Sequence, residues 1–174
     1  YEEARRGFEF GARHTTHTFN AMRGFHHREA GTVGYALANP DLTCELIYDR
    51  LHVCPDSARI LLQVKGAENV IAVSDSTAAT ELPPGTPLTM WGHPVDVGRG
   101  EVRLLSNGAL AGSAISLMEA FQNLAEDFGP ETAIQACCHN PRRALGLTGL
   151  PRVFVEWNFD YTLRRIHEMR LSPE

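Results

Sequence analysis

Apolar residues recur at helical spacing in several stretches of the chain, and glycine or proline marks the ends of these stretches. Pro55 followed by Asp56 suits a helix N-terminus, and Gly66 suits its C-terminus. Ser116 and Glu119 have capping-box spacing at the head of a later apolar-periodic stretch. We predict helices over residues 2–11, 31–39, 55–66, 115–128 and 130–139, the last broken near Asn140–Pro141.

Three other stretches have the character of strands. The segment HTTHTFN is rich in β-branched and aromatic residues, which favours a strand at about 13–19. LTCELIYD, residues 42–49, is an apolar strand that ends in Asp49. NVIAVSD, residues 69–75, is almost continuously apolar, which is typical of a parallel strand covered on both faces. We predict a fourth such strand at ALAGS, residues 109–113.

Residues 85–111 differ in character, because glycines there separate short β-like pieces. LTMWGHPVDV, EVRLL and ALAG are predicted to form hairpin-like strands inserted between a parallel strand and the next helix. The tail RVFVEWNFDYTLRRIHEM contains two strand candidates on either side of Asn158–Asp160.

The alternation of strand and helix with parallel-type strands predicts an α/β sheet or a (β/α)8 barrel. Complete barrels take about 250 residues, whereas this chain has 174 residues and only three convincing parallel strands plus the fourth candidate. The fold class is therefore α/β, with about half of a TIM-type barrel and a β-hairpin insertion. We assign residues 1–147 to the partial barrel and residues 148–174 to a separate C-terminal tail.

Composition excludes several classes of function. The net charge of −5 and the pI near 5.9 do not support a nucleic-acid surface. No run approaches the roughly 20 apolar residues of a membrane span, and no signal-peptide pattern opens the chain. The cysteines show no CxxC pair, so buried free thiols, including adjacent Cys137 and Cys138, and a reducing cytoplasm are expected.

Polar side chains follow the carboxyl ends of the predicted strands. His17 lies near the carboxyl end of the first strand and Asn20 follows it, Asp49 and His52 come at the end of the second, and Asp75 ends the third. In barrels this edge carries the catalytic groups, so these residues are the candidate site.

The stretch HTTHTFNAM raises the question of how its two histidines are used. Residues three positions apart on a strand face opposite sides, so we expect that His14 and His17 do not bind one metal together. His17, nearer the end of the strand, is the residue expected to face the site.

These residues also match a family. HTFNAM, HHREAG, LHV, the run ending in VSD, LAGSAISLMEA and HNPRRALGL occur in an order and spacing that resemble the C-terminal half of N-acetylglucosamine-6-phosphate deacetylases, which are metal-dependent amidohydrolases. The resemblance covers about residues 2–147. It implies a (β/α)8 barrel beside a small β-sandwich, of which the tail would hold remnants. It also implies hydrolysis of N-acetylglucosamine 6-phosphate to glucosamine 6-phosphate and acetate, a reaction of amino-sugar catabolism.

The resemblance further implies roles for individual residues. Asp75 is the catalytic acid and base, His17 is a ligand of a divalent metal (zinc or iron), and His52 lies near the acetyl carbonyl. Arg28 meets the phosphate of the substrate. The other substrate-binding residues are Asn20, Ala21, His52 and the backbone of Leu110, Ala111 and Gly112.

Three departures from the family pattern change these expectations. The family's other metal ligands, a Glu and a His, precede this chain, so we expect that it does not bind the metal tightly and that its activity alone is impaired. Arg50 replaces a small residue before LHV and is expected to narrow the sugar pocket. The segment after Leu147 is shorter than the family's glycine-rich, Asp-containing return to the sandwich and does not match it.

The open strand edges of a half-barrel predict a homodimer or larger assembly.

Each candidate residue also has a purely structural interpretation. His17 could be a hydrogen-bonded core histidine, and Asp75 could cap a helix. His52 could cap the helix in CPDSAR, and Arg28 could pair with Glu29.

Two other functions fit the sequence. The chain could act on another acylated amino sugar or a cyclic amide, in the same class of hydrolases. It could also be a non-catalytic half-barrel that binds a sugar phosphate or a partner chain.

Overall fold

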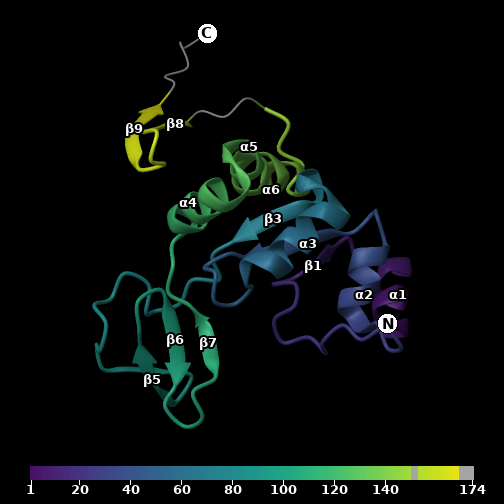
Figure 1. Ribbon diagram of the computed structural model, residues 1–174, viewed down its shortest axis with the longest axis horizontal. Helices are drawn as coiled ribbons and strands as arrows, with labels where there is room; N and C mark the ends of the chain where they lie inside the picture. The colour runs from purple at the N-terminus through teal and green to yellow at the C-terminus, as the bar shows by residue number, and fades with distance from the viewer. Residues whose placement is uncertain (150–152, 169–174) are drawn as a thin grey trace.

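The computed structural model describes residues 1–149 and 153–168, and it shows an α/β fold (Figure 1). A three-stranded sheet has the order β1-β2-β3 and is parallel throughout. Its strands are β1 (His14–Thr15), β2 (Thr43–Ile47) and β3 (Val70–Val73). Thr15 is paired with Cys44, and Ile47 with Val73. The three strands therefore direct their carboxyl ends to the same edge of the sheet.

Helices connect the strands and cover the sheet. The predicted punctuation is confirmed, because α3 begins at Pro55 and ends before Gly66, and α4 has a complete capping box made by Ser116 and Glu119. The helices are α1 (Glu2–Glu9), α2 (Gly31–Ala38), α3 (Pro55–Lys65), the 3-10 turn η1 (Ala67–Asn69), α4 (Leu117–Phe128), α5 (Pro130–Ile134), the π-helical turn η2 (Gln135–His139) and α6 (Asn140–Ala144).

One face of the sheet packs against α3, α4 and α5. Alternate residues of β2, among them Cys44 and Leu46, join Leu61 and Leu124 in this core. The intervening residue Glu45 faces the other side of the sheet, as the two-residue period of a strand requires. From that side Glu45 contacts the loop after β1, which carries His17.

The inserted strands form their own antiparallel sheet, in the order β4-β5-β6-β7, with a separate apolar core. They are β4 (Leu88–Met90), β5 (His93–Val97), β6 (Glu101–Leu104) and β7 (Leu110–Ser113). The hairpin-like strands predicted after residue 85 are thus confirmed. The prediction of a fourth parallel strand at residues 109–113 is wrong for most of its length, because β7 pairs antiparallel with β6. Only Ser113 makes a parallel bridge, to Ser76 beyond β3.

Two other predicted elements are corrected by the structure. The strand predicted at 13–19 ends at Thr15, because the amide of Thr18 turns to the carbonyl of Glu45 at 2.8 Å. The last helix does not break at Asn140–Pro141. Proline has no amide hydrogen to donate, and the wider π-helical turn before Pro141 accommodates this missing hydrogen bond. The helix then continues as α6.

The C-terminal hairpin consists of β8 (Val153–Trp157) and β9 (Leu163–Glu168), on either side of the predicted turn. Trp157 stacks on Phe121 of α4, with ring centroids 4.1 Å apart. The side-chain amide of Gln122 donates to the carbonyl of Tyr161 at 3.1 Å. The hairpin is therefore anchored to α4 by one aromatic contact and one hydrogen bond. The ends of the predicted tail strands, at 152 and 169, lie outside the described residues.

The cysteines are free thiols, as predicted, but they are not all buried. Cys44 is buried and Cys137 is partly buried, whereas Cys54 and Cys138 are exposed. Burial raises the pKa of Cys137 to about 12. Across residues 1–149 and 153–168, the structure contains no helix that is both long and apolar enough to cross a bilayer.

Candidate active site

The loop after β1 is held in an unusual conformation by its contacts with β2. His17, Phe19 and Ala21 all have positive φ angles, of 35°, 79° and 53°, which is uncommon for residues other than glycine. Thr18 is fully buried at the centre of the loop, and the amide of His17 donates to the carboxylate of Glu45 at 3.3 Å. Backbone strain of this kind persists where the surrounding structure enforces it, commonly at functional sites.

The Nδ1 atom of His17 is buried and has no hydrogen-bond partner among the described residues. Buried polar atoms are nearly always paired, so this nitrogen requires a partner from outside these residues. The interpretation of His17 as a hydrogen-bonded core histidine does not fit this geometry. The imidazole lines a cavity of about 350 Å³, together with Asn20, Ala21 and residues of α1.

A single nitrogen does not make a complete metal site. In residues 1–149 and 153–168 no group of three or more His, Cys, Asp or Glu side chains is placed to bind a metal, whereas a catalytic zinc usually takes about three protein ligands. The unpaired Nδ1 atom of His17 fits one ligand position. His14 bonds instead to the hydroxyl of Thr43.

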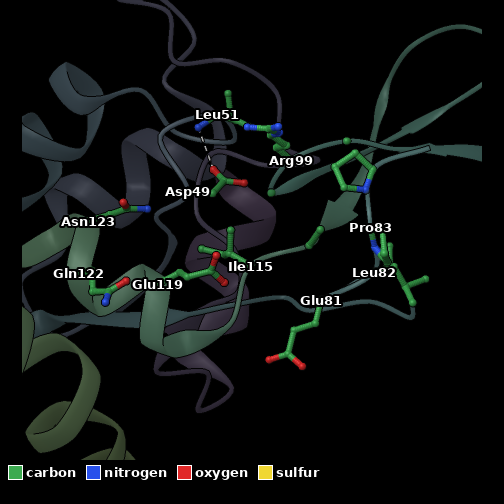
Figure 2. A pocket seen from close by; sticks show the side chains of 15 residues that line it. Asp49, Leu51, Glu81, Leu82, Pro83, Arg99, Ile115, Glu119, Gln122 and Asn123 are labelled. Atoms are coloured by element: carbon green, nitrogen blue, oxygen red, sulfur yellow. Dashed lines mark hydrogen bonds between the residues drawn. The ribbon is translucent and has the colours of Figure 1, made fainter. Parts of the chain in front are cut away.

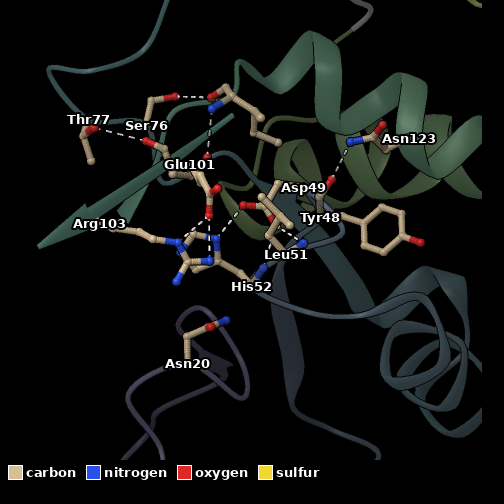
Figure 3. A network of polar contacts seen from close by, with 12 residues as sticks. Asn20, Tyr48, Asp49, Leu51, His52, Ser76, Thr77, Glu101, Arg103 and Asn123 are labelled. Carbon is tan, nitrogen blue, oxygen red and sulfur yellow. Dashed lines mark hydrogen bonds and ion pairs between the residues drawn. The ribbon is translucent and has the colours of Figure 1, made fainter. Parts of the chain in front are cut away.

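His52 and Asp49 form a buried pair after β2 (Figure 3). Nδ1 of His52 lies 2.5 Å from Oδ2 of Asp49, and the two side chains are only 6% and 1% exposed. Burial alone would raise the pKa of Asp49, but hydrogen bonds from the side chain and amide of His52 and from the amide of Leu51 lower it. The alternative that His52 caps α3 is wrong, because Cys54 occupies the N-cap position and no side chain caps this helix.

Asp75 follows β3 at the same edge of the sheet. Its side chain is exposed, and its φ angle of 49° places it in the left-handed region that Asp tolerates better than most residues. The carbonyl of Asp75 accepts from the amide of Ser113 at 3.2 Å, which joins this loop to β7. The helix-cap alternative is wrong, because no helix follows Asp75 before β4.

The backbone of β7 forms one wall beside Asp75. Ala111, Gly112 and Asp75 line a cavity of about 570 Å³. Gly112 has a φ angle of +88°, and a Cβ atom added to it would lie 2.5 Å from the methyl group of Thr77. The close approach of β7 to the Asp75 loop therefore requires glycine at this position. Leu110, at the start of β7, is not among the residues that line this cavity.

Arg28 lies exposed on the loop after β1. The alternative pairing of Arg28 with Glu29 is not what the structure shows, because Glu29 faces Arg23 at 3.8 Å. Among the described residues, the guanidinium of Arg28 has no ion-pair partner. It is thus available to a ligand.

The expectation that Arg50 narrows a pocket at this edge is wrong. Its guanidinium turns to α4, where it contacts both Glu126 and Asp127 at 2.8 Å. The Arg50 guanidinium lowers the pKa of Asp127. Arg50 therefore ties the loop after β2 to α4 and lines none of the cavities described above.

A third cavity, of about 540 Å³, separates Asp49 and Leu51 from α4 and the inserted sheet (Figure 2). Glu119, Gln122 and Asn123 of α4 line its other side. His17, Asp49 and Asp75 thus lie at one edge of the sheet but line three different cavities.

Two residues that organise this edge, Asp49 and Glu45, received no specific role from the sequence, although Asp49 was placed among the candidate-site residues. Asp49 orients His52, and the i, i+3 spacing of the two residues after an apolar strand is a signal that could have identified the pair. Glu45 holds the amide of His17, but its place within an apolar strand gives no indication of that contact.

Comparison with known proteins is consistent with this architecture. No family model matches the chain. The chain is 41% identical over 116 residues to N-acetylglucosamine-6-phosphate deacetylase of Bacillus subtilis (strain 168). The matched segment covers 67% of the chain and 29% of the relative. It is 38% identical over 136 residues to a protein of Escherichia coli (strain K12) provisionally named N-acetylgalactosamine-6-phosphate deacetylase, covering 77% of the chain and 80% of that protein.

Solved structures give the same result. A mutant N-acetyl-D-glucosamine-6-phosphate deacetylase of Mycobacterium smegmatis, in complex with N-acetyl-D-glucosamine-6-phosphate, superposes with a TM-score of 0.88 at 28% identity. The match covers 97% of this chain and 47% of that one. Fold and sequence together define a chain of the amino-sugar-phosphate deacetylase class. It belongs to the N-acetylglucosamine-6-phosphate deacetylase family. It spans less than half the length of the Bacillus and Mycobacterium proteins.

Proposed function

We propose that this chain is the site-bearing part of an amide hydrolase that converts N-acetylglucosamine 6-phosphate and water to glucosamine 6-phosphate and acetate. The observation that carries the proposal is the buried Nδ1 atom of His17, which has no partner among the described residues and lies at the same sheet edge as His52 and Asp75. The names of the relatives support the substrate class.

We further propose that residues 1–147 form the C-terminal half of a (β/α)8 barrel and that the hairpin within 148–174 belongs to a small β-sandwich. The parallel order β1-β2-β3, with helices between the strands, supports the first assignment. The free thiols support a reducing, cytoplasmic location.

In this proposal His17 holds a divalent metal, zinc or iron, together with further ligands that the described residues do not supply. A divalent ion at such a site lowers the pKa of water and polarises an amide carbonyl. Asp75 takes a proton from the attacking water while the oxygen of that water bonds to the acetyl carbon. Asp75 then returns that proton to the amine nitrogen as the carbon–nitrogen bond breaks.

The remaining residues bind and orient the substrate. His52 donates a hydrogen bond to the acetyl carbonyl oxygen, where negative charge develops. Asn20 and Ala21 line the sugar site, Arg28 binds the phosphate, and the backbone of residues 110–112 closes the opposite wall.

Replacing Arg28 by alanine should raise KM for N-acetylglucosamine 6-phosphate by about 10- to 100-fold, the effect of losing a charge-assisted hydrogen bond. Turnover of unphosphorylated N-acetylglucosamine should not change. Steady-state kinetics on both sugars measure the difference. Arg23→Ala, on the same exposed loop, is the matched control. Equal losses on both sugars would remove Arg28 from the phosphate site.

A second substrate is favoured by one specific observation, the 38% identity to the relative named for N-acetylgalactosamine 6-phosphate. The two sugars are epimers at C4, and the proposed roles of Asp75 and His52 do not involve that carbon. The ratio of kcat/KM for the two phosphorylated sugars distinguishes the alternatives. A ratio in favour of the galacto epimer would replace the proposed substrate and keep the mechanism.

The open edges of the described parallel sheet, at β1 and β3, lead us to propose a homodimer or larger assembly. Light scattering should give at least twice the mass of 19.2 kDa expected for one chain. A monodisperse monomer would contradict the proposal.

The non-catalytic alternative, a sugar-phosphate binding module, predicts substrate binding without release of acetate.

A further inference from the structure

The carboxylate of Asp49 is fully engaged by a small set of donors. Its Oδ1 atom accepts from the amides of Leu51 at 2.8 Å and of His52 at 2.7 Å. Its Oδ2 atom lies 2.5 Å from Nδ1 of His52. The main chain fixes the carboxylate, and the carboxylate in turn fixes the imidazole ring.

This contact determines which ring nitrogen of His52 faces the site. A carboxylate oxygen can only accept, so Nδ1 of His52 carries a proton. The other nitrogen, Nε2, has no partner among the described residues. Because His17 Nδ1 is the only buried, unpartnered side-chain nitrogen or oxygen in that part of the chain, Nε2 of His52 is reachable from solvent.

The state of Nε2 follows from the same geometry. With Nδ1 protonated, Nε2 can donate a hydrogen bond only when the ring carries both protons and a positive charge. The negatively charged carboxylate of Asp49 then lies against the positively charged ring. In the buried setting of the pair, a charge-assisted donor is roughly twice as strong as a neutral one.

We propose that Asp49 is a positioning residue that fixes the orientation and the tautomer of His52, so that Nε2 is presented to the carbonyl oxygen of the substrate as a charged donor. The contact between Asp49 and His52 stands on the structure alone. Only its use in deacetylation rests on the proposed function.

Asp49→Asn is a sharp test, because the main chain dictates how the amide must lie. The amides of Leu51 and His52 hold the side-chain oxygen of the asparagine, so its NH2 group faces Nδ1 of His52. That nitrogen must then accept, and the proton of the neutral ring moves to Nε2. The substitution is isosteric, keeps two of the three hydrogen bonds and reverses the direction of the third, so the fold is retained.

Nitrogen-15 NMR of chains with labelled histidine reads this change directly. In the neutral ring of His52, the wild-type chain should show a protonated Nδ1, and Asp49→Asn should show an unprotonated Nδ1 and a protonated Nε2. Asp96→Asn, a substitution of an exposed Asp on β5, should leave the spectrum unchanged. An unprotonated Nδ1 in the wild-type ring, or no change in Asp49→Asn, would overturn the proposal.

Kinetics then separate this inference from the proposed function. In the complete deacetylase, Asp49→Asn should lower kcat by about tenfold with little change in KM, since a charged donor becomes a neutral one. An unchanged kcat alongside the tautomer switch would show that the pair is only structural and would overturn its catalytic use. If the protein deacetylates no amino sugar, the proposed function fails, while the NMR result still decides whether Asp49 fixes His52.

Discussion

Replacing Asp75 by asparagine should lower kcat for acetate release by about 10²- to 10⁴-fold, the range expected for loss of a general acid–base group. Asparagine has the size of aspartate and tolerates the left-handed φ of 49° found here, so the loop should keep its conformation. What is lost is the capacity to accept a proton from water and return it to the amine.

Three measurements make this prediction specific. Circular dichroism should show an unchanged fold, and calorimetry should show substrate affinity within a few-fold of wild type. Asp96→Asn, which changes an exposed carboxylate of the inserted sheet, should retain full turnover. Turnover of the Asp75→Asn protein at the wild-type rate would exclude Asp75 from the mechanism and leave His17 and His52 without a base.

The second large effect is expected at Gly112. Replacing Gly112 by alanine should lower the free energy of unfolding by about 2–4 kcal/mol, the sum of the left-handed backbone cost and overpacking. The new Cβ atom would meet Thr77 at 2.5 Å. Thr77 cannot rotate away freely, because its hydroxyl donates to the carbonyl of Ser113 at 3.1 Å. Deacetylation should fall as well, since the displaced loop carries Asp75.

Gly108→Ala is the matched control for this effect. Gly108 has a similar φ angle of +72°, but no atom lies within 4 Å of a Cβ at that position. Its replacement should cost only the backbone part, about 1–2 kcal/mol. Urea denaturation of the two variants measures the difference. Equal stabilities for Gly112→Ala and Gly108→Ala would show that the contact between β7 and the Asp75 loop is not tight.

Much of the fold could be predicted from local signals in the sequence. Pro55 and Gly66 bound α3 as expected, and the capping box at Ser116 starts α4. The apolar run before Asp75 is a parallel strand. In each case the propensity of the segment and its tertiary environment favour the same structure, so the sequence was sufficient.

Elsewhere tertiary contacts override local preference. The threonines after His14 favour a strand, yet the chain turns because Thr18 is buried and its amide bonds to Glu45. The segment ALAGS has the composition of a core strand, but its pairing partner is β6. Such outcomes depend on residues about 30 positions away or on inserted strands, and no local pattern reports them.

The candidate site shows the same division. The positions of His52 and Asp75 at the ends of successive strands could be predicted, and so could the place of His17 near the end of the first, because parallel strands share a carboxyl edge. The role of Arg50 could not be predicted. The length of its side chain suggests that it obstructs the sugar pocket, and only the structure shows that it pairs with Glu126 and Asp127.

Acetate release from N-acetylglucosamine 6-phosphate by the complete protein, followed with the divalent metal present and after chelation, tests the central claim most directly. We predict one acetate and one glucosamine 6-phosphate per substrate consumed, and loss of both products after chelation or in a His17→Ala variant. A folded, metal-supplied protein that binds the sugar phosphate but releases no acetate from either epimer would contradict the account.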